Sequence, residues 1–243
     1  MLHRPVSAIV AAILLGSLAA APALAQPTPS SGPGLLGAAD EAWRDDFTTL
    51  TTWEILSDEV GTTVHDAAAG RLVVTVTADR STVWDDHVLD AAHPVLRVEA
   101  RVAVGGAGAA GVACGSSLGL ARWLWASVDD LGDWTFGRLI DGRLQVLQRG
   151  ELPVAVGAPG TASLIAIECA ADPEAGGDRA VVSIDGIPVT TAFDIPVGPY
   201  DRATILVSSD AAPVEGTFDD LLVHVGSSYL PPAQGSLPGP GFD

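Results

Sequence analysis

One short segment of the sequence combines an aromatic ring with neighbouring carboxylates. In STVWDDHVLD, residues 81–90, Trp84 stands directly before Asp85 and Asp86. An indole stacks on the apolar face of a sugar ring, and carboxylates accept hydrogen bonds from its hydroxyl groups. These three residues are therefore candidate ligand contacts. The alternative is that Trp84 packs in a core while the two acids are solvated.

A second segment, RWLWASVDDLGDWTF, holds three of the six tryptophans. A period of two places Trp123 and Trp125 on one face of a strand, and Trp134 and Phe136 on one face of the next. We expect a four-residue loop, 129–132, that sets Trp125 opposite Phe136 and gathers the four rings on a single face. A slip of one residue separates them. Such a cluster is more often core than site, so Trp134, beside the loop, is the candidate ligand contact here.

The acidic residues form no recognisable catalytic pair. Glu99 stands between Arg97 and Arg101 on one face of a strand, which predicts a solvated row of paired charges. Glu168 has no acid two residues away, and no G-x-S-x-G segment supports nucleophilic catalysis. We therefore predict no catalytic residue.

Metal-ligating residue types are present without the spacing of a metal site. His87 and His93 are six residues apart, and the other histidines are more widely scattered. We predict no cofactor, but calcium prefers carboxylate oxygens, and two groups of aspartates are candidate ligands for a structural calcium ion. The groups are Asp45, Asp46, Asp219 and Asp220, if the terminal strands pair, and Asp129, Asp130 and Asp133. Aspartates at strand ends also serve simply as turn residues.

The two cysteines, Cys114 and Cys169, form an even pair. In an oxidising compartment this favours one disulfide, and two free thiols are the alternative. In the chain-entropy account, closing this loop with a disulfide would stabilise the folded state by about 4 kcal/mol.

The N-terminus predicts export. A charged start, an apolar run from Val6 to Ala20 and the small-residue site Ala21-Pro-Ala-Leu-Ala25 are typical of a signal peptide over residues 1–25, although an uncleaved anchor is the alternative. The formal net charge is −18. So acidic a chain repels nucleic acid and anionic lipid, and nothing after the signal is apolar enough for membrane insertion. We expect a secreted, extracellular monomer.

The rest of the chain divides by composition. Residues 26–41 and 227–243 are rich in proline, glycine and serine, which predicts a flexible linker and a disordered tail around one domain over 42–226. That domain alternates in period two and shows no helical stripe. The predicted strands are 72–76, 95–102, 164–169, 180–184, 203–207 and 221–225, with others between them. About twelve short strands predict an all-β, two-sheet antiparallel sandwich.

The order of the motifs is also informative. Asp45-Asp46-Phe47 opens the domain and Phe218-Asp219-Asp220 closes it, while Gly111-Val-Ala-Cys114 precedes Trp123-Leu-Trp125. This order resembles the concanavalin A-like, laminin G-like jelly rolls of secreted bacterial proteins, including 3-keto-disaccharide hydrolase-like relatives. The sequence departs from them in having Gly115 where an arginine is frequent.

The resemblance implies a jelly roll over residues 42–226, cysteines on neighbouring strands, and carbohydrate as the ligand class. Glucanases of this fold carry a Glu-x-Asp-x-Glu strand, which is missing here. The expectation is therefore a secreted, non-catalytic module that binds carbohydrate or a cell-envelope glycan. The alternatives are a glycoside hydrolase-like enzyme on the same fold and a structural or protein-interaction sandwich with no small ligand.

Overall fold

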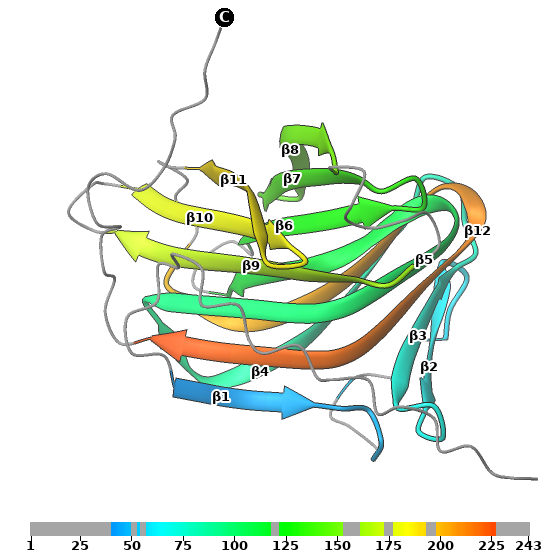
Figure 1. The fold of residues 1–243 in the computed structure, drawn as a ribbon, viewed down its shortest axis with the longest axis horizontal. Coiled ribbons are helices and arrows are strands. Elements are labelled where there is room, and N and C mark those ends of the chain that lie inside the picture. Colours follow the sequence, from blue (N-terminus) through cyan, green and yellow to red (C-terminus); the bar gives the residue numbers. More distant parts are fainter. Residues whose placement is uncertain are drawn as a thin grey trace, which may run out of the picture. The chain divides into compact units, whose positions relative to one another are not determined.

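The computed structural model describes residues 40–49, 53, 57–117, 122–152, 161–172, 177–192 and 198–226. The predicted signal peptide, nearly all of the predicted linker and the predicted tail lie outside these residues. The described part forms twelve strands and no helix (Figure 1). It therefore contains no helix that could span a membrane. The strands are β1 (Asp40–Asp45), β2 (Gly61–Asp66), β3 (Arg71–Val76), β4 (Thr82–His93), β5 (Val95–Ser116), β6 (Arg122–Asp129), β7 (Asp133–Ile140), β8 (Arg143–Glu151), β9 (Ser163–Asp172), β10 (Gly177–Ile184), β11 (Ile187–Ala192) and β12 (Tyr200–Gly226).

All twelve strands belong to one antiparallel hydrogen-bonded sheet that folds over on itself into two layers (Figure 1). Layer 1 consists of β11, β10, β9, residues 95–102 of β5 and residues 214–226 of β12, with β1, β3 and β2 beyond them. Layer 2 consists of β8, β7, β6, residues 109–116 of β5, residues 200–208 of β12, and β4. The predicted all-β sandwich of about twelve strands is confirmed.

Two long strands carry the chain from one layer to the other. β5 and β12 pair along almost their whole length, and their register breaks between Ser209 and Glu215. Gly106 has a φ of +100° there, and a Cβ on it would lie 2.6 Å from the Pro213 carbonyl oxygen. Bulges and glycine permit such a bend. The strands predicted at 203–207 and 221–225 are present, but they are two halves of one long strand, β12, and not separate elements.

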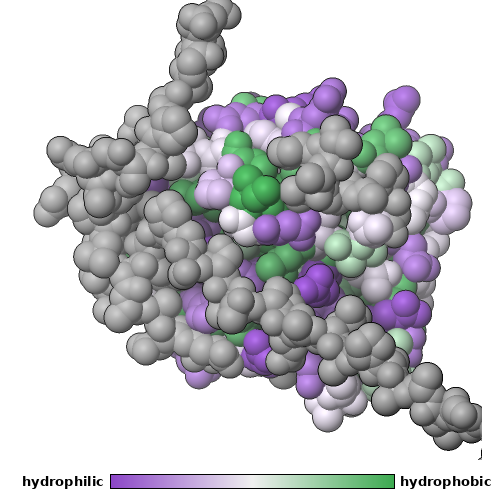
Figure 2. Space-filling model, in the orientation of Figure 1, coloured by the Kyte–Doolittle hydropathy of each residue, from purple (hydrophilic) through white to green (hydrophobic). Residues whose placement is uncertain are grey.

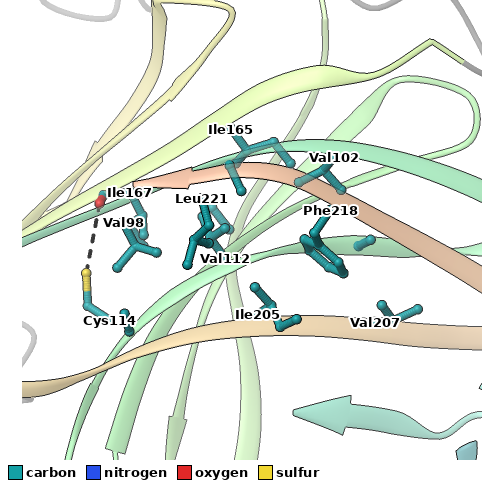
Figure 3. Close-up of a cluster of buried hydrophobic side chains, with 14 of the residues drawn as sticks. Val98, Val102, Val112, Cys114, Ile165, Ile167, Ile205, Val207, Phe218 and Leu221 are labelled. Atoms are coloured by element: carbon teal, nitrogen blue, oxygen red, sulfur yellow. Dashed lines mark hydrogen bonds between the residues drawn. The ribbon is translucent and has the colours of Figure 1, made fainter. Parts of the chain in front are cut away.

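The core lies between the layers. Figure 3 shows Val98, Ile165 and Ile167 of layer 1 facing Val112 and Ile205 of layer 2. All five side chains are fully buried. Burying such aliphatic side chains is the main favourable contribution to folding.

The predicted disulfide between Cys114 and Cys169 is confirmed, with Cα atoms 6.5 Å apart. Cys169 lies on β9 opposite Leu96, whereas Cys114 lies on the other half of β5, opposite Leu124. The implied placement on neighbouring strands is confirmed, since β5 pairs with β9, but Cys114 lies on the half of β5 that belongs to layer 2. The bond ties the two layers together through the core.

Figure 2 shows the molecule in the same orientation, coloured by hydropathy. On its coloured part, hydrophilic residues are interspersed with small apolar groups. Single exposed apolar residues are normal on a protein surface. Trp84, Trp123 and Trp125 form a separate apolar group with Leu206 on layer 2.

Candidate functional site

The hairpin of β6 and β7 decides which tryptophans face outward. Trp125 lies opposite Gly137, while Ala126 lies opposite Phe136 and Val128 opposite Trp134. Cross-strand partners share a face, so Trp134 and Phe136 point toward the core, and Trp125 points away from it. The predicted gathering of four rings on one face is wrong.

The turn explains this register. Only residues 130–132 separate the end of β6 from the start of β7, and Gly132 has a φ of +89°. The Asp129 carboxylate accepts hydrogen bonds from the amides of Leu131 and Asp133, at 2.9 and 2.8 Å. A three-residue loop ending in a left-handed glycine is a common hairpin connection. It is one residue shorter than the predicted loop, which moves the β7 rings to the other face.

The outward tryptophans each lie across a glycine of the next strand. A Cβ on Gly115 would be 2.4 Å from Trp123 Nε1, and a Cβ on Gly137 would be 2.4 Å from the Trp125 ring. Both are direct cross-strand pairs. No other residue type leaves room for these rings, so the glycines let the indoles lie close against the sheet.

A hydrogen-bonded network holds one end of this outer face. Trp123 Nε1 donates to Thr204 Oγ1 at 3.1 Å, and that hydroxyl donates to Asp86 Oδ1 at 2.6 Å. Arg202 donates to the other Asp86 oxygen at 3.0 Å. The half-buried Trp84 ring packs against Trp123, with centroids 6.1 Å apart. Asp86 and two indoles therefore have fixed positions beside one another.

A cleft of about 680 Å³ hollows the same face toward the bend of β5 and β12. This volume is in the range of small-molecule binding sites. Trp125, Leu144 and Val146 give it an apolar wall. The remaining side chains are mainly hydroxyls and charged groups, including Ser127, Thr135, Ser208, Asp133, Arg149 and Glu151.

Two buried polar atoms of the cleft lack a hydrogen-bond partner in the described part of the chain. They are Trp125 Nε1 and Ser209 Oγ, on residues only 5% and 3% exposed. A buried polar group without a partner costs about 1–3 kcal/mol. Native structures leave few such groups unexplained, and here both line one cleft. The cleft therefore has two buried polar atoms that the described residues leave unpartnered.

The four residues proposed from the sequence divide between the two faces of layer 2. Trp84 and Asp86 lie on the outer face, opposite Leu206 and Thr204. Asp85 alternates with them and is 7% exposed. Trp134 belongs to the main core at 9% exposed, although it lines one end of the cleft. Their part in binding stays a prediction.

Sequence reasoning missed the outward role of Trp123 and Trp125 and the contribution of Ser209. The signal for the two tryptophans was present, since Asp129 and Gly132 are the residues that a three-residue loop prefers. Ser209 lies at a break of register in β12, which the alternation of side chains does not reveal.

Of the charges predicted as a solvated row on layer 1, Glu99 is in fact buried, while Arg97 and Arg101 are partly exposed. Arg97 contacts Glu99 at 2.6 Å and Glu168 at 3.4 Å, and the two glutamates are 8% and 2% exposed. Buried carboxylates need such partners. Arg101 lies apart, 4.0 Å from Asp220. These glutamates are on a different layer from the cleft.

The aspartates considered for calcium act mainly in turns. Asp45 accepts hydrogen bonds from the Phe47 amide and Trp53 Nε1, and Asp46 accepts from Thr48. Burial raises the pKa of Asp45 above its ordinary value. Among the described residues, no three His, Cys, Asp or Glu side chains converge as a metal site would require.

One histidine has a defined aromatic partner. His87, on the inward side of β4, stacks on Trp43 of β1 with ring centroids 3.8 Å apart. Burial lowers the pKa of His87, and the nearby Asp45 and Asp90 oppose that shift. The stack closes the edge of the sandwich between β1 and β4, so a structural role accounts for it.

Comparison with known proteins supports the fold and not a closer kinship. No family profile and no curated protein sequence matches the chain. A prokaryotic β-1,3-1,4-glucanase (lichenase) derived from a mouse hindgut metagenome is 11% identical, with a TM-score of 0.53, over 76% of this chain and 99% of that one. A protein of unknown function with a galectin-like fold from Bacillus subtilis is 11% identical, with a TM-score of 0.56, over 79% and 98%.

An endo-1,3-β-glucanase from Streptomyces sioyaensis is 14% identical, with a TM-score of 0.53, over 84% of this chain and 100% of that one. At such identities the likeness shows the fold alone. The chain therefore has the concanavalin A-like jelly-roll fold that its motifs predicted.

Proposed function

We propose that this chain is an exported, non-catalytic module that binds carbohydrate in the cleft on the outer face of layer 2. The observation that carries the proposal is the pair of buried, unpartnered polar atoms, Trp125 Nε1 and Ser209 Oγ, that line this cleft. A sugar hydroxyl accepts from the indole N–H and either donates to or accepts from the serine.

The rest of the cleft matches the two-sided chemistry of a sugar. A pyranose has apolar C–H faces, which suit Trp125, Leu144 and Val146. Its rim of hydroxyls suits the surrounding serines, threonines and carboxylates. In the register of layer 2, Trp84 shares a row with Ser127 of the cleft. A longer glycan therefore reaches Trp84 and Asp86, the contacts predicted from the sequence.

Two further observations support the setting. The disulfide is compatible with an oxidising compartment, as export requires. Several structural neighbours of the same fold are glucanases. They guide the choice of ligands to test.

The test is a binding measurement with matched variants. Titrate laminarin, barley β-1,3-1,4-glucan and a wider glycan panel, following tryptophan fluorescence and calorimetry. Trp125→Phe keeps a ring but removes the N–H, and Ser209→Ala removes the hydroxyl. We expect each to weaken binding about tenfold, because one ligand hydrogen bond is lost. Trp43→Phe, outside the cleft, is the control and leaves affinity unchanged. Wild-type affinity in both cleft variants, or no glycan bound at all, contradicts the proposal.

A second candidate function is glycoside hydrolysis, and one observation favours it. Asp133 and Glu151 are direct cross-strand partners in the cleft. Cβ atoms of such pairs are about 5 Å apart, and retaining glycosidases hold two carboxyl groups about 5–5.5 Å apart. The test is the release of reducing ends from the same polysaccharides. Release that is abolished in Asp133→Asn and Glu151→Gln would show that the function is hydrolysis and not binding alone.

A further inference from the structure

A second hollow lies on the opposite face of the β7–β8 hairpin from the cleft. It has a volume of about 390 Å³ and is lined by Arg138, Ile140, Asp141, Arg143 and Gln145. Arg138 lies opposite Leu124 on one side and Gln145 on the other, so it points to the same side of layer 2 as the core. β8 is exposed along nearly its whole length. At the β7–β8 hairpin, polar side chains on the inner face of layer 2 therefore reach solvent, whereas elsewhere this face is covered by the core.

The two arginines can act on one ligand. Gln145 is the direct partner of Arg138, and Arg143 is two residues before Gln145, so the arginines are diagonal neighbours across the hairpin. Diagonal Cα atoms lie about 7–8 Å apart, within reach of long side chains. Arg138 Nε donates to Gln145 Oε1 at 2.9 Å, which orients the guanidinium and leaves its terminal nitrogens available.

Both guanidinium groups lack a carboxylate partner in the part of the chain that the structure describes. This is unexpected by composition, because the chain has 30 acidic residues and only 12 basic ones. Asp141 also lines the hollow, yet it forms no ion pair with either arginine. One guanidinium group oriented by Gln145 and a second, unpaired one beside it are the donors that suit an oxyanion.

We propose that Arg138 and Arg143 bind a single carboxylate group, carried by an acidic sugar or a small organic acid. The planar fork of a guanidinium matches a carboxylate. The charge of −18 and the nearby Asp141 disfavour polyanions and dianions, which leaves a monoanion as the best fit. The site is separate from the cleft, so a test of this proposal does not depend on the carbohydrate binding proposed for the cleft.

The experiment is calorimetric titration of the full chain with sodium glucuronate, with acetate and glucose in parallel. We expect glucuronate to bind and glucose to leave this site empty. Acetate binding as tightly as glucuronate identifies a free carboxylate as the ligand, whereas preference for glucuronate identifies an acidic sugar. Arg138→Gln and Arg143→Gln should each weaken binding about tenfold. Asp141→Asn should strengthen it.

Arg71→Gln is the matched control, because it removes the same charge from an exposed arginine. Arg71 is paired with Asp66 across β3 and β2, which are not part of the β7–β8 hairpin. This variant should leave affinity unchanged. Equal weakening of glucuronate binding in Arg71→Gln and Arg138→Gln would show that the effect comes from the net charge of the protein, and it would overturn the proposal. Absence of saturable binding of both anions would also overturn it. Unchanged melting temperatures of the variants show that each is folded.

Discussion

The two faces of layer 2 place the same residue types in different surroundings. On the inner face, Phe136 and Trp134 pack into the core, and Phe136 is fully buried. On the outer face, Trp123 and Trp125 lie across glycines and border a cleft that contains unpartnered polar atoms. Aromatic content alone does not separate core from site. The separation comes from hairpin register and from whether buried polar atoms have partners.

The largest effect should come from cutting the link between the layers. Replacing both cysteines, Cys114→Ala and Cys169→Ala, opens a loop of 55 residues. We expect the free energy of unfolding to fall by about 4 kcal/mol. Chemical denaturation measures this, and the single variants Cys114→Ala and Cys169→Ala should lose a similar amount. Wild-type stability in the double variant would contradict a role for the bond in holding the inner faces together.

A smaller effect should follow from adding one methyl group beneath an outward indole. In Gly137→Ala, the new Cβ would overlap the Trp125 ring, so we expect a loss of about 1–3 kcal/mol together with weaker glycan binding. Gly105→Ala is the control, because its Cβ would meet only a carbonyl oxygen at 4.0 Å. Denaturation and titration of both variants should separate them. Equal behaviour of the two alanine variants would mean that the indole does not lie over Gly137.

Removing a single hydrogen bond from the outer face should cost less. Trp123→Phe loses the donor to Thr204, and we expect a fall of about 1 kcal/mol in stability. The fold should persist, since Thr204 still donates to Asp86. Denaturation curves measure the change. A loss as large as that of the double cysteine variant would show that this face is core rather than site.

The smallest effect concerns pH and the inner edge of layer 2. The pKa of His87 is lowered in the folded state, so the unfolded chain binds its proton more readily. Stability from this group is complete above the unfolded pKa, near 6.5, and declines as the pH falls from there through the lowered folded pKa. Asp45, whose pKa is raised, acts in the opposite sense at lower pH. Denaturation between pH 8 and pH 5 should show a decline in the free energy of unfolding that His87→Gln removes. The same decline in that variant would mean that another group causes it.

The sequence was sufficient for the fold because its alternation is strong and local. Strands such as β3 and β9 match their predicted ranges within a few residues. The continuity of β12 was not predictable. The turn-like segment Asp210-Ala-Ala-Pro213 interrupts the alternation of side chains, yet β12 remains paired with β5 at Ala211 and again from Glu215 onward. The disulfide pairing followed from there being only two cysteines.

The candidate site was less predictable, and one residue of loop length accounts for most of the difference. Trp84 and Asp86 were proposed as ligand contacts because a ring and a carboxylate stand together in the sequence, and they stay a prediction. Trp125 was assigned to the wrong cluster, because residues 130–132, and not four residues, form the loop. The network of Trp123, Thr204 and Asp86 joins three strands that are distant in sequence, and no local pattern encodes it.

The most direct test of the outer-face site is an NMR titration of the indole N–H signals with the tightest-binding glycan of the panel. A donor without a protein partner must shift strongly when a ligand hydroxyl accepts from it. The Trp125 Nε1–H signal should therefore move furthest, and that of Trp53, bonded to Asp45, should stay in place. A stationary Trp125 signal at saturation, with the glycan bound, would contradict the account.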